Sequence, residues 1–150
     1  MPDFSKYLDI DVSSIERPRA LPGGHFFAQV KGWKPDERNY AKAGAPKKLT
    51  PVVTVNFTIL AAHDDVDAAM VPEDLSKVAA SKDYDLSDER GLYALRRLTE
   101  ETVGVDTKGL HLEDALNAIE GGDVLLFNEP RAGKEEGEFY TNITKVLPVP

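Results

Sequence analysis

The chain contains no cysteine, so neither disulfide bonds nor thiolate metal ligands are available to it. A small fold without cysteine suits a reducing compartment, and the cytoplasm is therefore the expected location. Long apolar runs are also lacking, because none approaches the ~20 residues that span a bilayer. Residues 1–6 do not show the basic-then-apolar order of a secretory signal. We therefore expect no contact with a membrane.

The sequence patterns of catalytic and metal sites are absent as well. No Gly-x-Ser-x-Gly nucleophile motif occurs. Residues 44–50 lack the Gly-Lys-Ser/Thr ending of a phosphate loop and precede a predicted strand instead of a helix. The acidic run at residues 63–67 lacks the glycine and the closing glutamate of a calcium loop, which favours a solvated turn. We expect no enzymatic activity, no cofactor and no metal.

Charge is distributed unevenly along the 150 residues, which carry a net charge of −8. Residues 31–48 hold six basic and two acidic side chains, whereas residues 61–120 hold six basic and fifteen acidic ones. The overall acidity disfavours binding to phosphates, but the first of these segments is locally basic. Any contact with nucleic acid is therefore expected there.

Two segments alternate as β-strands do. In residues 25–33, one face is suited to a core and consists of Phe26, Ala28 and Val30. The opposite face mixes aromatic and polar side chains, namely Phe27, Gln29, Lys31 and Trp33. In residues 52–60, the inward residues are Val53, Val55, Phe57 and Ile59.

Proline and glycine separate the predicted elements. Residues 34–51, with three prolines and one glycine, predict a long hairpin loop or flap. Residues 1–22 predict an extended arm that wraps the domain, because Pro18 and Pro22 disfavour helix.

Residues 61–122 are expected to form an acidic helical insertion. A short helix is predicted after Pro72. A second is predicted with Asp85 or Ser87 as its cap, an apolar face of Leu92, Leu95 and Leu98, and an end at residues 103–104. A third, at residues 110–119, places Leu112, Ala115, Leu116 and Ile119 on one side and ends at residues 121–122.

The C-terminal part returns to β structure. Residues 123–128 predict a short strand, and residues 139–147 alternate again after a charged turn. The inward set of the last strand is expected to be Phe139, Thr141, Ile143 and Leu147, with Tyr140, Asn142 and Thr144 on the other face.

Strands, then helices, then a closing hairpin exclude an alternating βαβ plan. We predict a single, mainly β (α+β) domain over residues 1–150, an OB-fold-like small Greek-key barrel with an acidic helical insertion. Four strands are identified, and the fifth is expected between Ala61 and Tyr84.

The first strand and the loop after it combine basic and aromatic side chains. Single-stranded nucleic acid is bound by a basic groove and by rings on which bases stack. The candidate binding residues here are Phe27, Lys31, Trp33, Lys34, Arg38, Tyr40, Lys42, Lys47 and Lys48. The last hairpin adds Arg131 and Tyr140. The open alternative is that Trp33 and Tyr40 pack the loop onto the barrel while the lysines only solubilise the surface.

Four segments carry a resemblance to a known family, namely residues 9–18, 21–26, 55–59 and 140–146. They resemble bacteriophage single-stranded-DNA-binding proteins with an OB-fold. The resemblance implies a protein that coats single strands during phage DNA replication or recombination in the cytoplasm of the infected host. The sequence differs from many such proteins in two ways: it does not end in an acidic tail, and it has a long acidic helical segment.

The leading hypothesis is sequence-tolerant binding of single-stranded DNA on the face of Phe27, Lys31 and Trp33, with the 34–48 loop closing over the backbone. Replication or recombination proteins are possible further partners, and homo-oligomers are left open. The alternative is a protein-interaction module or inhibitor that uses its acidic helical surface. A third hypothesis, a nuclease or other hydrolase that uses residues 63–67, would require Mg²⁺-dependent cleavage.

Overall fold

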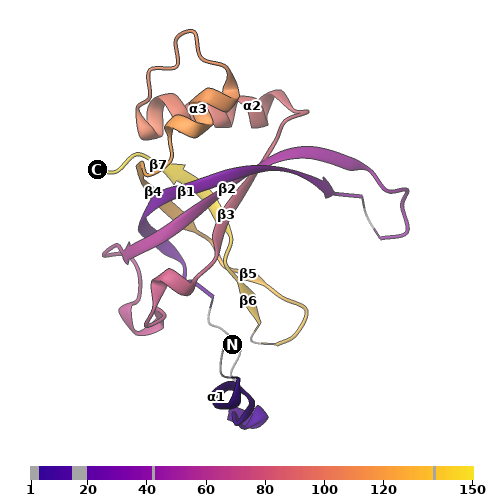
Figure 1. Ribbon diagram of the computed structural model, residues 1–150, viewed down its shortest axis with the longest axis vertical. Helices are drawn as coiled ribbons and strands as arrows, with labels where there is room; N and C mark the ends of the chain where they lie inside the picture. The colour runs from indigo at the N-terminus through magenta and orange to yellow at the C-terminus, as the bar shows by residue number, and fades with distance from the viewer. Residues whose placement is uncertain (1–3, 15–19, 42, 137) are drawn as a thin grey trace.

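A sheet of five antiparallel strands, in the order β3-β2-β1-β4-β7, is the largest element of the fold (Figure 1). The computed structural model describes residues 4–14, 20–41, 43–136 and 138–150. The strands of the sheet are β1 (Gly24–Asn39), β2 (Leu49–Ala62), β3 (Ala80–Asp85), β4 (Asp123–Asn128) and β7 (Ile143–Leu147). A separate hairpin pairs β5 (Arg131–Ala132) with β6 (Phe139–Tyr140). The predicted mainly β class is confirmed.

The strand order is that of a Greek key, because β1, β2 and β3 are successive neighbours and β4 returns to lie beside β1. The fifth strand expected between Ala61 and Tyr84 is β3, which ends one residue later, at Asp85. Strands β3 and β7 stand at the two ends of the order, and no ladder joins them in the described ranges. The predicted barrel is therefore not closed.

Strand β1 continues far beyond the predicted first strand, and the prediction of a loop over residues 34–51 is wrong. Residues from Phe26 to Asn39 pair with β2, so the connecting loop is confined to residues 40–48. Only Gly24 to Gln29 also pair with β4. Val30 still exchanges backbone hydrogen bonds with Gly121 and Gly122, but beyond it this edge of β1 pairs with no strand in the described ranges. Pro35 is tolerated there because its missing N–H needs no partner.

A β-bulge at Lys31 reverses the alternation of β1. Val30 lies opposite Phe57 and Gly32 opposite Asn56, so Lys31 has no direct partner. Trp33 therefore lies opposite Val55, a fully buried residue, and faces the core. The prediction that Trp33 shares a face with Phe27 is wrong, because a single extra residue exchanges the two faces of a strand.

The segment predicted as a helical insertion contains β3 as well as five short helices. These are η2 (Ala68–Met70), η3 (Leu75–Lys77), α2 (Glu89–Arg97), a π-helical segment η4 (Leu98–Val103) and α3 (Leu112–Ala118). The helix expected after Pro72 is only the 3₁₀ turn η3. None of the helices in the described ranges is long and apolar enough to cross a membrane.

The two longer helices occupy the predicted positions but differ in detail. Asp88 caps α2 by accepting a hydrogen bond from the backbone N–H of Arg90, so neither Asp85 nor Ser87 is the cap. Leu92 is 43% exposed and Leu112 38% exposed, although both were expected to face the core. The apolar faces of the two helices are therefore narrower than predicted, with Leu95 and Leu98 buried in one and Ala115, Leu116 and Ile119 in the other.

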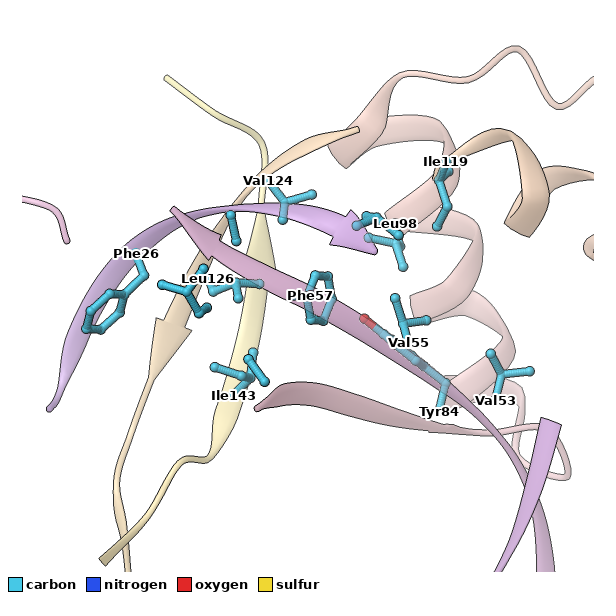
Figure 2. Close-up of a cluster of buried hydrophobic side chains, with 14 of the residues drawn as sticks. Phe26, Val53, Val55, Phe57, Tyr84, Leu98, Ile119, Val124, Leu126 and Ile143 are labelled. Carbon is cyan, nitrogen blue, oxygen red and sulfur yellow. The ribbon is translucent and has the colours of Figure 1, made fainter. Parts of the chain in front are cut away.

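The hydrophobic core joins the sheet to these helices (Figure 2). Its strand residues include Phe26, Val55 and Leu126, and its helical residues include Leu95, Leu98, Leu116 and Ile119. In Figure 1, α2 and α3 lie together at one end of the sheet. The helical segment is therefore part of the folding unit, because its removal would expose the buried ends of the strands.

The two ends of the chain also differ from the prediction. Residues 4–14 form α1 (Ser5–Leu8) and η1 (Val12–Ser14) instead of an extended arm, and α1 projects from the domain (Figure 1). Residues 15–19 lie outside the described ranges. In the last hairpin, Ile143 is buried as expected, but Phe139 is 55% exposed and Val146 packs on the core in place of Leu147.

Asn128 ties the start of the ordered domain to its last strands. Its side-chain amide is fully buried and donates hydrogen bonds to the carbonyls of Leu21 and Pro22, both at 2.9 Å. Its side-chain oxygen accepts one from the backbone N–H of Asn142 at 2.7 Å. These bonds satisfy buried polar groups that secondary structure leaves unpaired.

Substituting Gly91 in α2 tests the packing of this helix on β3. A Cβ at this position would lie 2.0 Å from the carbonyl oxygen of Asp85, which cannot move without disturbing the end of β3. We expect Gly91→Ala to lower the free energy of unfolding by roughly 1–3 kcal/mol, although alanine favours helix. Urea denaturation measures this. The control Tyr93→Ala, at an exposed position of α2, should stay within about 0.5 kcal/mol of the wild type, and an equally stable Gly91→Ala would contradict the packing.

Candidate nucleic-acid interface

The face of the sheet opposite the core, here called the outer face, is polar along β1, β2 and β3. Thr54 and Asn56 point outward because they alternate with the buried Val53, Val55 and Phe57. The register places Lys34 and Asp83 beside Thr54. These neighbours come from three strands, so only the pairing of the strands brings them together.

A pocket of about 700 Å³ opens where η3 passes these strands, and we call it the lysine groove. It is lined by Lys31, Gly32, Trp33, Lys34, Asn56, Phe57, Thr58, Ser76, Lys77, Val78, Ala79, Ala80 and Ser81. Three ammonium groups, three hydroxyls and one amide are thus gathered without a carboxylate among the described lining residues. Such a set suits an anion with several oxygens, such as a phosphodiester.

Two of the groove lysines, Lys34 and Lys77, form only long ion pairs. Lys34 Nζ lies 3.8 Å from a carboxylate oxygen of Asp36, and Lys77 Nζ lies 3.9 Å from one of Asp74. Both distances are too long for a hydrogen bond. The side chains of Lys34 and Lys77 are 60% and 83% exposed, so both ammonium groups are accessible to a ligand.

Trp33 borders the groove but is held by the helices. Its indole Nε1 donates a hydrogen bond to Asn117 Oδ1 in α3 at 2.9 Å, and its ring packs against the core. This is the packing role that the sequence left open for Trp33. The ring links β1 to α3, so it does not present a free face beside Phe27.

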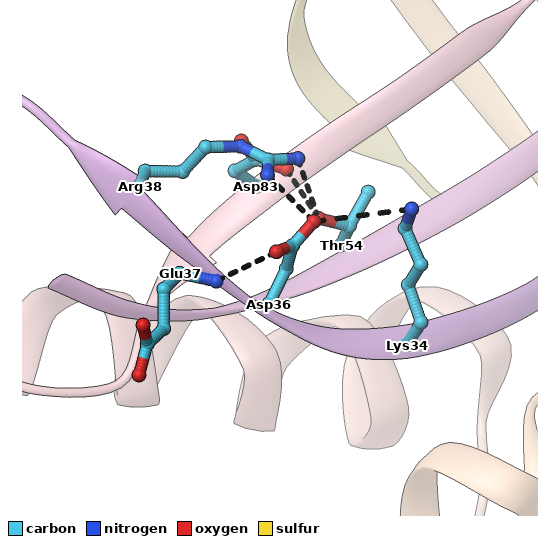
Figure 3. A network of polar contacts seen from close by, with 6 residues as sticks. All are labelled: Lys34, Asp36, Glu37, Arg38, Thr54 and Asp83. Carbon is cyan, nitrogen blue, oxygen red and sulfur yellow. Dashed lines mark hydrogen bonds and ion pairs between the residues drawn. The ribbon is translucent and has the colours of Figure 1, made fainter. Parts of the chain in front are cut away.

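The guanidinium of Arg38 donates hydrogen bonds to side chains of its own sheet (Figure 3). Its Nε donates to Asp83 Oδ2 at 2.9 Å and its Nη1 to Asp36 Oδ2 at 2.6 Å. Its Nη2 donates to Thr54 Oγ1 at 3.3 Å, and Thr54 Oγ1 donates to Asp83 Oδ1 at 2.6 Å. Donating hydrogen bonds to the carboxylates of Asp36 and Asp83 raises the pKa of Arg38 above its ordinary value. The guanidinium therefore fastens the end of β1 across β2 to β3.

The remaining residues predicted in the loop lie at the tip of the β1–β2 hairpin. Tyr40 is 59% exposed, and Lys47 and Lys48 are exposed. Lys42 lies outside the described residues. Desolvation raises the pKa of Tyr40, and the nearby Asp83 acts in the same direction.

The two predicted residues of the last hairpin are brought together. Arg131 and Tyr140 face each other across β5 and β6. They line a pocket of about 540 Å³ with Ala132, Gly133, Lys134, Thr141 and Asn142. Both side chains are exposed, as a binding role requires.

Phe27 belongs to a cluster that the sequence did not reveal, here called the aromatic patch: His25, Phe27, His63 and Phe127. The ring centroids of Phe27 and His63 are 5.2 Å apart, and those of His25 and Phe127 are 4.7 Å apart. The alternation of His25 with Phe26 was a signal that His25 faces outward with Phe27. The pairing of β1 with β4, which brings in Phe127, left no trace in the sequence.

The comparisons with known proteins identify no relative. No protein-family model matches the chain, and no curated protein matches it. The described ranges also contain no group of three or more His, Cys, Asp or Glu side chains placed to hold a metal ion. The outer face and its charges are therefore the basis on which a function is inferred.

Removing Arg38 tests its assignment to the fold. We expect Arg38→Ala to lower the thermal unfolding midpoint, and by less at high salt, because exposed ion pairs are screened. The pKa of Asp36 is lowered by hydrogen bonds from Glu37 N–H and then from Arg38, so this stabilisation is present at neutral pH. It is lost as the pH falls below 3.8, the ordinary value, through the lowered pKa of the folded state.

Lys108→Ala is the control for Arg38→Ala, because this exposed lysine lies in the turn before α3 and no ion pair is recorded for it in the described ranges. An unfolding midpoint for Arg38→Ala equal to that of Lys108→Ala, measured by circular dichroism, would contradict the role of Arg38 as a fastener.

Proposed function

We propose that this protein binds single-stranded DNA, with little regard to sequence, along the outer face of β1 and β2. The observation that carries the proposal is the lysine groove, whose described lining combines Lys31, Lys34 and Lys77 with hydroxyl and amide groups and includes no carboxylate. Contacts from lysine to phosphate release counterions and act on any sequence.

The architecture supports the proposal. We infer that the sheet is an OB-fold-like barrel left open between β3 and β7, since five strands in Greek-key order carry the helices α2 and α3 between β3 and β4. OB-folds bind oligonucleotides on the face of their second and third strands and through loops at either side. The corresponding surface proposed here is the lysine groove, which lies on β1, β2, β3 and η3.

The net negative charge is compatible with such binding because of where the acid lies. Asp36 and Asp83, the carboxylates nearest the groove on β1 and β3, are engaged by Arg38. Asp74 lies 3.9 Å from Lys77 in a long ion pair. Much of the remaining acid belongs to the helical segment over residues 86–120. Screening at physiological salt has a length of about 8 Å, so distant carboxylates oppose phosphate only weakly.

The proposed contacts are a revised set of the residues predicted from sequence. Lys31 and Lys34 are joined by Lys77, which sequence reasoning did not select because it lies in η3, distant in the chain. We propose that Tyr40, Lys47 and Lys48 near the tip of the β1–β2 hairpin and Arg131 and Tyr140 on β5 and β6 extend the contact. Trp33 and Arg38 leave the set, because both are committed to the fold.

The resemblance noted in the sequence adds a biological setting to this proposal. A protein that coats single strands regardless of sequence serves DNA replication or recombination, here of a bacteriophage in the cytoplasm of its host. Other replication or recombination proteins are its proposed partners.

Titration with single-stranded oligonucleotides at several salt concentrations tests the function. The affinity of the wild type should fall with salt, with a slope of about 0.7 for each phosphate contact. Lys34→Ala should weaken binding at low salt and reduce the slope by about 0.7, whereas Lys108→Ala should change neither. Fluorescence anisotropy of a labelled thymidine oligonucleotide gives both quantities. A wild type that binds no single strand at low salt would contradict the proposal.

A protein-interaction module is the second candidate, and one observation favours it. The helical segment over residues 86–120 exposes four large apolar side chains, which are Leu92, Tyr93, Leu110 and Leu112. Exposed apolar groups among charged ones are typical of protein contact surfaces. Binding of a partner that survives substitution of the groove lysines but fails after substitution of these four residues would support this function.

A further inference from the structure

The aromatic patch lies on the outer face and draws its rings from three parts of the chain. His25 and Phe27 come from β1, Phe127 from β4, and His63 directly follows β2. His25 lies opposite Phe127 in the register, and the rings of His25 and His63 are 6.4 Å apart between centroids. All four side chains are half-buried, so each has a packed side and an accessible side.

Two rings of the patch, those of His25 and Phe127, have polar contacts that help to hold them in place. Asp65 accepts hydrogen bonds from the backbone N–H of His25 at 3.0 Å and lies 2.6 Å from the ring nitrogen Nδ1. Lys145 on β7 places its ammonium 5.5 Å from the centre of the Phe127 ring. Fixed rings lose little conformational freedom when they receive a ligand.

The patch and the lysine groove lie along the same strand. Phe27 and Gly32 are five residues apart on β1, a separation of about 17 Å at most. Gln29 lies between them and is held by a hydrogen bond from its Nε2 to Asp123 Oδ1 at 3.1 Å. One extended single strand can therefore reach both places, since such domains cover about 4–16 nucleotides.

We propose that the aromatic patch is a nucleobase-stacking site, occupied by a base of the same strand whose phosphates the lysine groove holds. Aromatic faces bind bases of any identity, which agrees with binding that tolerates many sequences. Lys145 supplies a positive charge beside the stacked base for the adjoining phosphate. This inference rests on the proposed function but makes a separate claim, because the groove binds phosphates and the patch binds bases.

Two ligands with equal charge separate the two claims. One is a thymidine oligonucleotide of about 12 residues, and the other is an abasic oligonucleotide with the same number of phosphates. The wild type should bind the thymidine ligand more tightly. The double variant F27L/F127L should lose roughly five- to a hundredfold in affinity for the thymidine ligand and little for the abasic one. Lys34→Ala should lower the affinity for both ligands by the same factor.

Two further variants serve as controls for the stacking test. F27Y/F127Y retains both rings and should bind the thymidine ligand nearly as the wild type does, which separates loss of stacking from loss of folding. Phe4→Leu removes an exposed phenylalanine far along the chain from the patch and should have no effect. Thermal unfolding of each variant verifies that it is folded.

The outcomes distinguish the two proposals. Equal affinity of the wild type for the two ligands, or an equal loss on both in F27L/F127L, would overturn the stacking site and leave the lysine groove standing. Failure of the wild type to bind either ligand would overturn both. A loss confined to the thymidine ligand and restored by the tyrosine variant is the result expected of a stacking site.

Discussion

The bulge at Lys31 is the constraint on which the rest of the structure depends. Without the extra residue, the strict alternation of β1 would carry Trp33 to the outer face and Lys34 to the core. With it, the indole reaches Asn117 and joins the sheet to α3, while Lys34 faces outward toward Thr54. One irregularity thus both attaches the helices and exposes a groove lysine.

Ion pairing within the sheet makes the outer face suitable for an anion. Asp36 and Asp83 would oppose phosphate if they were free, but both are hydrogen-bonded to Arg38. Asp36 and Asp83 are thereby engaged mainly by Arg38, while Lys34 and Lys77 of the groove form only long ion pairs and stay exposed. An acidic protein can have a locally positive surface in this way, because salt screens the carboxylates that lie far from that surface.

Much of the core was predictable from residue patterns, whereas the length of the elements was not. The buried sets of Phe26 to Val30 and Val53 to Ile59 follow directly from alternation. Gly104 and Gly121 end their helical segments with positive φ angles, as the sequence indicates. The prediction of a loop over residues 34–51 was wrong because proline is excluded only from a strand that is paired on both edges. The sequence pattern does not show that β1 has a free edge at Pro35.

Local sequence was enough to predict a mainly β class, the core faces of two strands, and two separate segments, one basic and aromatic and the other acidic. Those features depend on neighbours in the chain, and alternation and composition record them directly. Tertiary structure alone decided that Arg38 and Trp33 serve the fold, that Lys77 joins Lys31 and Lys34, and that Phe127 meets His25. Each of these depends on strand register or on a contact between distant segments, and one bulged residue is sufficient to change it.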